Sequence, residues 1–90
     1  MARFLVVHKA SYEHLGTMDR MIDIAKQVRD SAPEACHWLN SWWDAEDELL
    51  FCDWEAPDEH VLRSALEKFL YYWSIEKIYP VLWSNPEWYE

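Results

Sequence analysis

The sequence predicts an α+β fold in which strands and helices follow the order strand, helix, strand, strand, helix, strand. Runs rich in β-branched and aromatic residues occur at residues 3–9, 36–43, 49–55 and 74–82. Between them, two stretches repeat apolar residues at helical spacing. A chain of 90 residues forms one domain. This order is typical of the ferredoxin-like βαββαβ sandwich, a four-stranded antiparallel sheet with two helices on one face.

The first half of the chain carries signals for one strand and one helix. Residues 3–9, RFLVVHK, form the first strand, and residues 11–16, which include a histidine, form a connection. Thr17 is expected to cap the helix, with Asp19 in its first turn where the helix dipole favours an acid. Pro33 is expected to end this helix.

The second half carries a hairpin, a helix and a last strand. The acidic segment 44–48, DAEDE, separates the two hairpin strands. Asp58 is expected to cap the second helix, with Glu59 in the first turn. Pro80 removes one ladder hydrogen-bond donor from the strand at 74–82, so this strand is predicted at a sheet edge.

Composition and charge exclude several classes of protein. The predicted domain spans residues 1–82, and residues 83–90 form an aromatic C-terminal tail. A formal charge of -9 repels nucleic acid and an anionic membrane, so neither is an expected partner. The start, MARFLVVHKA, holds an apolar run too short for a signal sequence or a membrane span. The chain is therefore expected in the cytoplasm.

The hairpin register decides which side chains share a sheet face. If residues 44–47 form the loop, Trp43 pairs with Glu48 and the rest of the register follows. The face suited to helix packing carries His37, Leu39, Ser41 and Trp43 opposite Trp54, Cys52, Leu50 and Glu48. The other face carries Cys36, Trp38, Asn40 and Trp42 opposite Glu55, Asp53, Phe51 and Leu49. Bulky aromatic residues beside a few polar groups are typical of a small-molecule pocket.

The two cysteines are predicted to be free thiols. In this register Cys36 and Cys52 lie three positions apart along the ladder and on opposite faces. At about 3.3 Å per residue the separation is roughly 10 Å, which is beyond the reach of a disulfide. The sequence has no CxxC pair, so a zinc knuckle is not expected.

The first strand alternates two sets of side chains, and either set can face the helices. The sets are Phe4, Val6 and His8, and Leu5 and Val7. In the ferredoxin-like order the first strand lies beside the third. His8 could therefore approach Asp53 or Glu55 if it shares their face, and a metal site needs three or four such donors.

Three segments of the chain resemble a known family. The segments FLVVHK, WLNSWWDAEDELLFCDWEAPD and SIEKIYPV, within residues 3–81, are similar to small bacterial ferredoxin-like proteins catalogued as a domain of unknown function, with nickel-binding members. The resemblance implies a homodimer whose two open sheets face each other in a dimeric α+β barrel. It also implies that Phe4, Val6 and His8 lie on the open face, whereas Leu39 and Cys52 point to the helices.

The chain departs from that family's pattern in its histidines and its tail. Nickel-binding members carry additional histidines in both helices. Here the first helix, MDRMIDIAKQVRD, has none, and the second has only His60 near its start. Only His8 therefore carries over as a metal ligand, and nickel is implied by the resemblance alone. The tail beyond Val81 is longer than the family's usual end.

These observations predict a homodimer that binds a small ligand in an aromatic-lined lumen. The predicted lumen residues are Phe4, His8, Trp38, Asn40, Trp42, Phe51 and Asp53. One alternative is a cofactor-independent monooxygenase or isomerase, in which Asn40 binds a substrate oxygen and His8 moves a proton. Another is a structural or partner-binding module that uses the aromatic tail, with Trp83 or Trp88 exposed.

Overall fold

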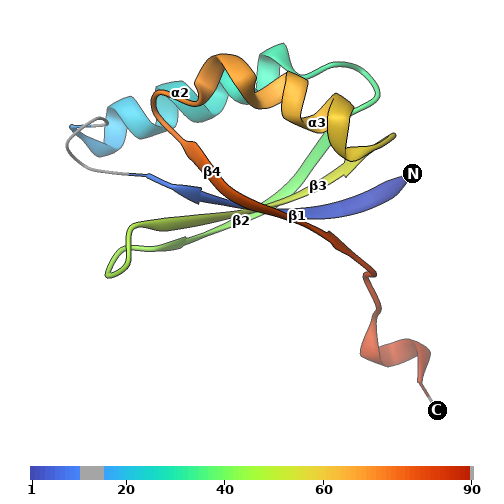
Figure 1. The fold of residues 1–90 in the computed structure, drawn as a ribbon. Helices are drawn as coiled ribbons and strands as arrows, with labels where there is room; N and C mark the ends of the chain where they lie inside the picture. Colours follow the sequence, from blue (N-terminus) through green and yellow to red (C-terminus); the bar gives the residue numbers. More distant parts are fainter. Residues whose placement is uncertain (11–15, 90) are drawn as a thin grey trace.

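The predicted α+β sandwich is confirmed. The computed structural model describes residues 1–10 and 16–89. Its elements are β1 (Ala2–Lys9), α2 (Met18–Ser31), β2 (His37–Asp44), β3 (Leu49–Ala56), α3 (Glu59–Leu66), β4 (Ser74–Val81) and the short 3-10 helices η1 (Glu67–Phe69) and η2 (Pro86–Trp88). The four strands pair antiparallel in the order β2-β3-β1-β4, and both α-helices cover one face of the sheet (Figure 1).

Local signals placed most of the element ends correctly. The Thr17 side chain accepts a hydrogen bond from the Arg20 backbone N–H at 3.2 Å, and the Asp58 side chain accepts one from the Val61 N–H at 2.8 Å. Both residues cap their helices as predicted. The predicted connection at 11–16 and its His14 lie outside the described residues, apart from Gly16.

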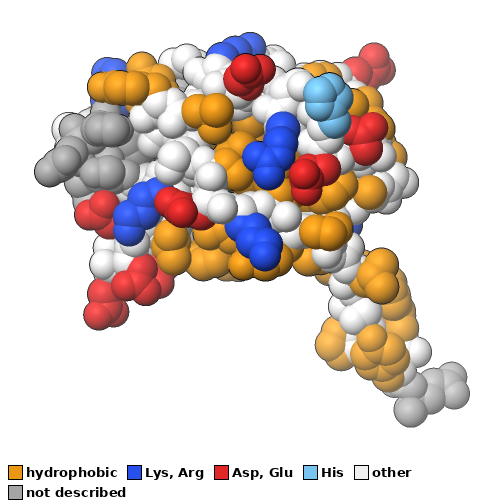
Figure 2. All heavy atoms as spheres, viewed as in Figure 1, with side chains coloured by type: hydrophobic (Ala, Val, Ile, Leu, Met, Phe, Trp, Pro, Cys, Tyr) orange, Lys and Arg blue, Asp and Glu red, His pale blue; other side chains and the backbone are white. Residues whose placement is uncertain are grey.

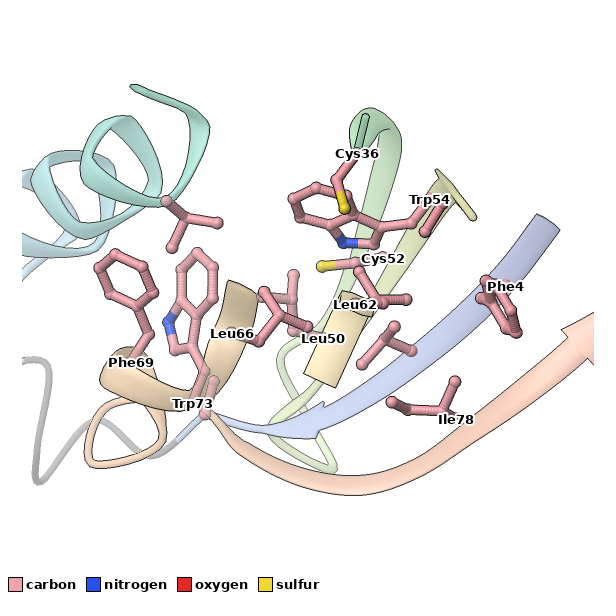
Figure 3. Close-up of a cluster of buried hydrophobic side chains, with 14 of the residues drawn as sticks. Phe4, Cys36, Leu50, Cys52, Trp54, Leu62, Leu66, Phe69, Trp73 and Ile78 are labelled. Atoms are coloured by element: carbon pink, nitrogen blue, oxygen red, sulfur yellow. The ribbon is translucent and has the colours of Figure 1, made fainter. Parts of the chain in front are cut away.

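The core lies between the helices and one face of the sheet (Figure 3). Alternate residues of the two central strands supply its sheet side, and α2, α3 and the segment after α3 supply the other. Its buried members include Phe4, Val6, Leu50, Cys52, Trp54, Ile24, Val28, Leu62, Leu66, Phe69 and Trp73. β4 lies at a sheet edge, as Pro80 predicted, and β1 lies between β3 and β4.

The hairpin turn is displaced by one residue from the predicted loop. Asp44 pairs with Leu49, and its carboxylate accepts hydrogen bonds from the backbone N–H groups of Glu46 and Asp47 at 3.1 and 3.2 Å. This Asx-type turn places the loop at 45–48, with Glu48 in the left-handed region at φ 54°. Trp43 therefore pairs with Leu50 rather than Glu48, a shift of two residues that preserves the predicted faces.

A β-bulge reverses the faces in the first part of β2. The pairing shifts between Trp38 and Asn40, so Leu39 has no ladder partner and Trp38 pairs with Trp54. The predicted place of Trp38 on the open face is therefore wrong. Its ring stacks on the buried ring of Trp54, with centroids 5.7 Å apart and planes 10° apart, on the side of the helices.

The same bulge corrects three other expectations. His37 pairs with Glu55 and is exposed instead of facing the helices, and Leu39 is exposed at the bulge. Cys36 joins the core beside Cys52 (Figure 3) instead of lying on the opposite face. Both thiols are free, as predicted.

The side chains of β1 that lie on the open face are not the set that the resemblance implied. Phe4, Val6 and His8 are buried in the layer under the helices. Leu5 and Val7 are half-buried and alternate with them on the other face. The expectation of an open-face position for Phe4 and His8 is therefore wrong. Because β1 is a central strand, the set under the helices becomes core, and Phe4 fits that layer opposite Trp54.

Candidate functional site on the open sheet face

The sheet face opposite the helices, termed the open face below, carries the candidate site. No helix covers it in the part of the chain that the structure describes (Figure 1). The alternation of the paired strands assigns to it Arg3, Leu5 and Val7 of β1, Asn40 and Trp42 of β2, Leu49, Phe51, Asp53 and Glu55 of β3, and Lys77, Tyr79 and Val81 of β4. The centre of this face is apolar, and Arg3, Asp53, Glu55 and Lys77 place charged groups around it.

An ion pair between Arg3 and Asp53 is the main polar feature of this face. Arg3 Nε and Nη2 donate to the two carboxylate oxygens of Asp53, each at 2.6 Å. The side chains retain only 19% and 12% of their exposure, so the pair is largely withdrawn from water. These hydrogen bonds raise the pKa of Arg3 above its usual value. Arg3 therefore stays charged at any physiological pH, and the two-bond geometry of the pair fixes both side chains.

Aromatic and aliphatic side chains surround this ion pair. The Arg3 guanidinium carbon lies 5.4 Å from the centre of the Trp83 ring, within the range of a cation–π contact. A depression of about 140 Å³ opens beside the pair. It is lined by Arg3, Leu5, Trp42, Asp53, Val81, Leu82 and Trp83. This depression combines apolar walls with a fixed charge pair, as ligand pockets do.

Four of the predicted lumen residues share the open face. Asn40 pairs with Asp53 across β2 and β3, and Trp42 pairs with Phe51 in the same way. Trp42 is 55% exposed, so its ring is available for contact. The other three predicted residues, Phe4, His8 and Trp38, lie on the helix side of the sheet and are not brought together with these four.

Arg3 was not among the predicted site residues, and Trp83 was predicted only as an exposed residue of the aromatic tail. A signal for Arg3 was present, because it alternates with Leu5 and Val7 on a strand expected beside the one that carries Asp53. A basic residue on one strand and an acid on its neighbour form a cross-strand ion pair when they share a face. Trp83 follows β4 directly, and its contact with Arg3 depends on the path of the chain after Val81.

His8 lies in an apolar environment that suppresses its charge. It is 1% exposed, its ring centre is 5.7 Å from that of Trp73, and neither ring nitrogen has a hydrogen-bond partner of good geometry among the described residues. Burial lowers the pKa of His8 to about 4, and the nearby backbone of Trp73 and Ser74 offsets this only in part. His8 is therefore neutral at pH 7 and has no route to a ligand on the open face.

This buried imidazole predicts an acid-sensitive fold. Because the native pKa of about 4 is below the usual 6.5, the unfolded chain binds a proton that the folded chain does not between these two values. Stability is then full above pH 6.5 and falls as the pH drops towards 4. We expect the free energy of unfolding to be about 2 kcal/mol lower at pH 5 than at pH 7. Urea denaturation at both pH values measures it, and His8→Leu should remove most of the difference. If the stability of His8→Leu falls between pH 7 and pH 5 as much as that of wild type, groups other than His8 cause the pH dependence.

The described residues do not form a metal site. Residues 1–10 and 16–89 contain no group of three or more His, Cys, Asp or Glu placed to hold an ion. His8 faces the helices, whereas Asp53 faces the other way, so the predicted donors do not converge. Burial raises the pKa of the Cys52 thiol to about 12, which disfavours a thiolate ligand. Nickel needs several converging N, O or S donors, and these residues do not supply them.

Comparisons with known proteins place the chain in a family. The model of a family described as "Nickel responsive protein SCO4226-like" matches residues 4–81. The chain belongs to this family. The crystal structure of SCO4226 from Streptomyces coelicolor A3(2) is similar in fold, with a TM-score of 0.69 and 23% identity over 93% of this chain and 100% of that chain. No curated protein matches.

Two further findings concern membrane-spanning helices and the extent of the family match in this SCO4226-like protein. In the part of the chain that the structure describes, no helix is long and apolar enough to cross a membrane. The family match ends at Val81, so Leu82 and Trp83, which line the depression on the open face, lie beyond the matched residues. Part of the candidate site is therefore built from residues outside the family match.

Proposed function

We propose that the protein is a homodimer that binds a small planar molecule between two open faces. The observation that carries this proposal is the Arg3–Asp53 pair, an ion pair withdrawn from water and set among apolar side chains on a face that no described helix covers. An ion pair is costly to remove from water, and a role in recognition would account for its presence among apolar side chains.

The apolar surroundings of the pair support a second copy as the cover. Leu5, Val7 and Phe51 lie at the centre of the face, and Trp42 and Tyr79 lie toward its two edges with about half of their surface exposed. A contiguous apolar patch of this kind usually marks an interface. Two copies facing each other in this way would bury roughly 2,000 Å² in total, the size of an obligate contact.

The size of the depression also favours a shared site. At about 140 Å³ it is too small for most ligands. Two such depressions brought face to face would approach about 300 Å³, where small-molecule pockets begin. A neighbouring depression of about 520 Å³, which shares Arg3 and Trp83, is already present in one copy, so the dimer would enlarge and cover the site.

The chemistry of the lining indicates the class of ligand. Trp42 and Phe51 lie opposite each other and offer ring faces for stacking. Arg3 uses two of its five N–H donors on Asp53, so three remain for an acceptor. The Asn40 amide, paired across the ladder with Asp53, adds a donor and an acceptor nearby. We therefore expect a flat ring that carries a carboxylate or carbonyl edge.

Asn40→Leu tests the ligand proposal. A set of small aromatic carboxylates and amides is titrated while tryptophan fluorescence is followed, and each ligand found is titrated again with the variant. Loss of the amide should weaken binding by about 1–3 kcal/mol, because a ligand oxygen loses its partner. Gln27→Leu makes the same change on the exposed surface of α2 and should have no effect. If no compound quenches the fluorescence, or if both variants bind alike, the pocket proposal is wrong.

Nickel binding is expected to be weak or absent, although the family is described as nickel responsive. The prediction follows from the lack of converging donors among the described residues. Isothermal titration with nickel at neutral pH should show no submicromolar site. Native mass spectrometry of protein purified without added metal should likewise show no bound nickel. A tight site at one ion per chain would contradict this prediction, and a metal function would then replace the ligand proposal.

The alternative of an enzyme lacks support, because the two residues that it requires do not share a cavity. A monooxygenase or isomerase of this fold needed His8 beside Asn40 in one cavity, and these residues lie on opposite faces of the sheet. No other observation favours it. The expected location in the cytoplasm stays a prediction, and the two free thiols are consistent with a reducing compartment.

A further inference from the structure

We infer that the C-terminal arm, residues 82–89, packs against the second copy of the chain and clasps the dimer at its flank. The inference rests on the dimer proposed above and extends it to a segment outside the family match at residues 4–81. Four observations support it: the arm is folded, its rings are exposed, it points to the partner's side of the sheet, and it adds little charge.

The arm has a defined structure of its own. The Asn85 side chain accepts a hydrogen bond from the Glu87 N–H at 3.0 Å and caps η2. The backbone N–H groups of Trp88 and Tyr89 donate to the carbonyls of Asn85 and Pro86 at 2.9 and 3.1 Å. The Trp83 and Trp88 rings meet edge to face, with centroids 4.9 Å apart. This packing makes the arm a preformed aromatic element rather than a loose tail.

Most of the apolar surface of the arm lies in water. Leu82 is 100% exposed, and Trp83, Trp88 and Tyr89 are each more than half exposed. The body of the same chain thus leaves these side chains largely uncovered. At about 25 cal/mol per Å² of apolar area, covering them gives a strong drive to associate. A folded segment with large exposed rings is typical of a contact site.

The direction of the arm indicates what covers it. The arm leaves the edge strand β4 and extends from the sheet to the side opposite the helices (Figure 1). Hydrophobic side chains run along its length (Figure 2). Its root also borders the open face, because Leu82 and Trp83 line the depression beside Arg3. A second copy placed on the open face would lie on the side to which the arm extends, and twofold symmetry would supply two such contacts.

The charge of the chain is compatible with this contact. Each chain carries a formal charge of -9, so two copies repel each other. Most of residues 82–90 are uncharged, and the exceptions are Glu87 and Glu90. The arm can thus add buried apolar area to the dimer with little further repulsion. It is suited to a partner that has the same negative charge as its own chain.

An intermolecular relaxation experiment tests the inference directly. A nitroxide is attached to Ser84→Cys, since Ser84 is exposed and both native cysteines are buried. The chain that carries the nitroxide contains no ¹⁵N. It is mixed with an equal amount of ¹⁵N-enriched wild type that carries no nitroxide. Broadening in the ¹⁵N chain then reports only contacts between copies. We expect broadening of strand amides in the partner, whereas a mock reaction of wild type should give none.

A pair of substitutions supplies an independent readout. Trp88→Ser with Tyr89→Ser should raise the Kd of dimerisation at least about thirtyfold, the effect of losing one interface hot spot. Met18→Ser removes an exposed apolar side chain from the helix side and should leave the Kd unchanged. Circular dichroism of all the variants should match that of wild type, because the arm lies outside the core.

The outcomes separate this inference from the proposed dimer. Broadening between copies together with a weakened dimer supports the arm contact. A stable dimer without either effect overturns the arm contact and leaves the dimer standing. A second sample carries the nitroxide and ¹⁵N on one chain, diluted in unlabelled wild type. Broadening of strand amides confined to that sample would place the arm on its own chain and overturn the inference. A wild type that sediments as a monomer overturns both.

Discussion

Replacing Trp38 with alanine is expected to lower the free energy of unfolding by about 3 kcal/mol, at the low end for a core tryptophan because this side chain is only partly buried. The Trp38 ring stacks on Trp54 and meets the edge of Trp73 at 6.1 Å between centroids. Its indole N–H also donates to Ser41 Oγ at 2.7 Å. The substitution leaves a cavity between these rings. Urea denaturation at pH 7 gives the difference in stability.

Trp42→Ala is the matched control, since it removes the same side chain from the same strand. The bulge at Leu39 leaves Trp42 on the open face, where its ring is 55% exposed. We expect little change in the stability of the single chain, but weaker dimerisation and ligand binding. Equal losses of stability in Trp38→Ala and Trp42→Ala would mean that the two rings share a face. A strand without the bulge would place them in this way.

Asp53→Ala is expected to cost about 3 kcal/mol of stability, because the Arg3 guanidinium loses both of its hydrogen bonds and keeps only the charge of Glu55 nearby. Since both side chains keep some exposure, the cost lies at the low end for a buried pair. Chemical denaturation at low protein concentration measures it. A loss below about 1 kcal/mol would show that the pair behaves as an ordinary surface salt bridge.

The double variant Arg3→Met with Asp53→Leu separates stability from recognition. Apolar residues of similar size should restore most of the stability that Asp53→Ala loses, because no unpaired charge remains. Ligand binding should not return, since the guanidinium donors are gone. Recovery of both properties would show that the ion pair has no part in binding.

The fold was predictable from the sequence because its signals are local. Thr17 and Asp58 mark two helix starts, and Pro80 marks an edge strand. Each acts within a few residues, so the surrounding fold does not change what it indicates. Chain order then leaves few topologies open.

The faces of individual side chains were harder to predict, because they depend on single-residue shifts. The bulge at Leu39 has no marker in the sequence, yet it moves Trp38 from the open face to the core. The alternation of β1 fitted either orientation, and the resemblance favoured the wrong one for His8. A histidine in a sequence suggests a site residue, but the imidazole of His8 lies in an apolar layer that keeps it uncharged.

Sedimentation velocity at low micromolar concentration tests most directly whether two copies close their open faces over the Arg3–Asp53 pair. We expect wild type to sediment as a dimer, and Leu5→Glu as a folded monomer, because the substitution adds a charge at the centre of that face. Gln27→Glu adds the same charge on α2 and should remain a dimer. A wild type that sediments as a monomer, or a Leu5→Glu variant that stays dimeric, would contradict the account.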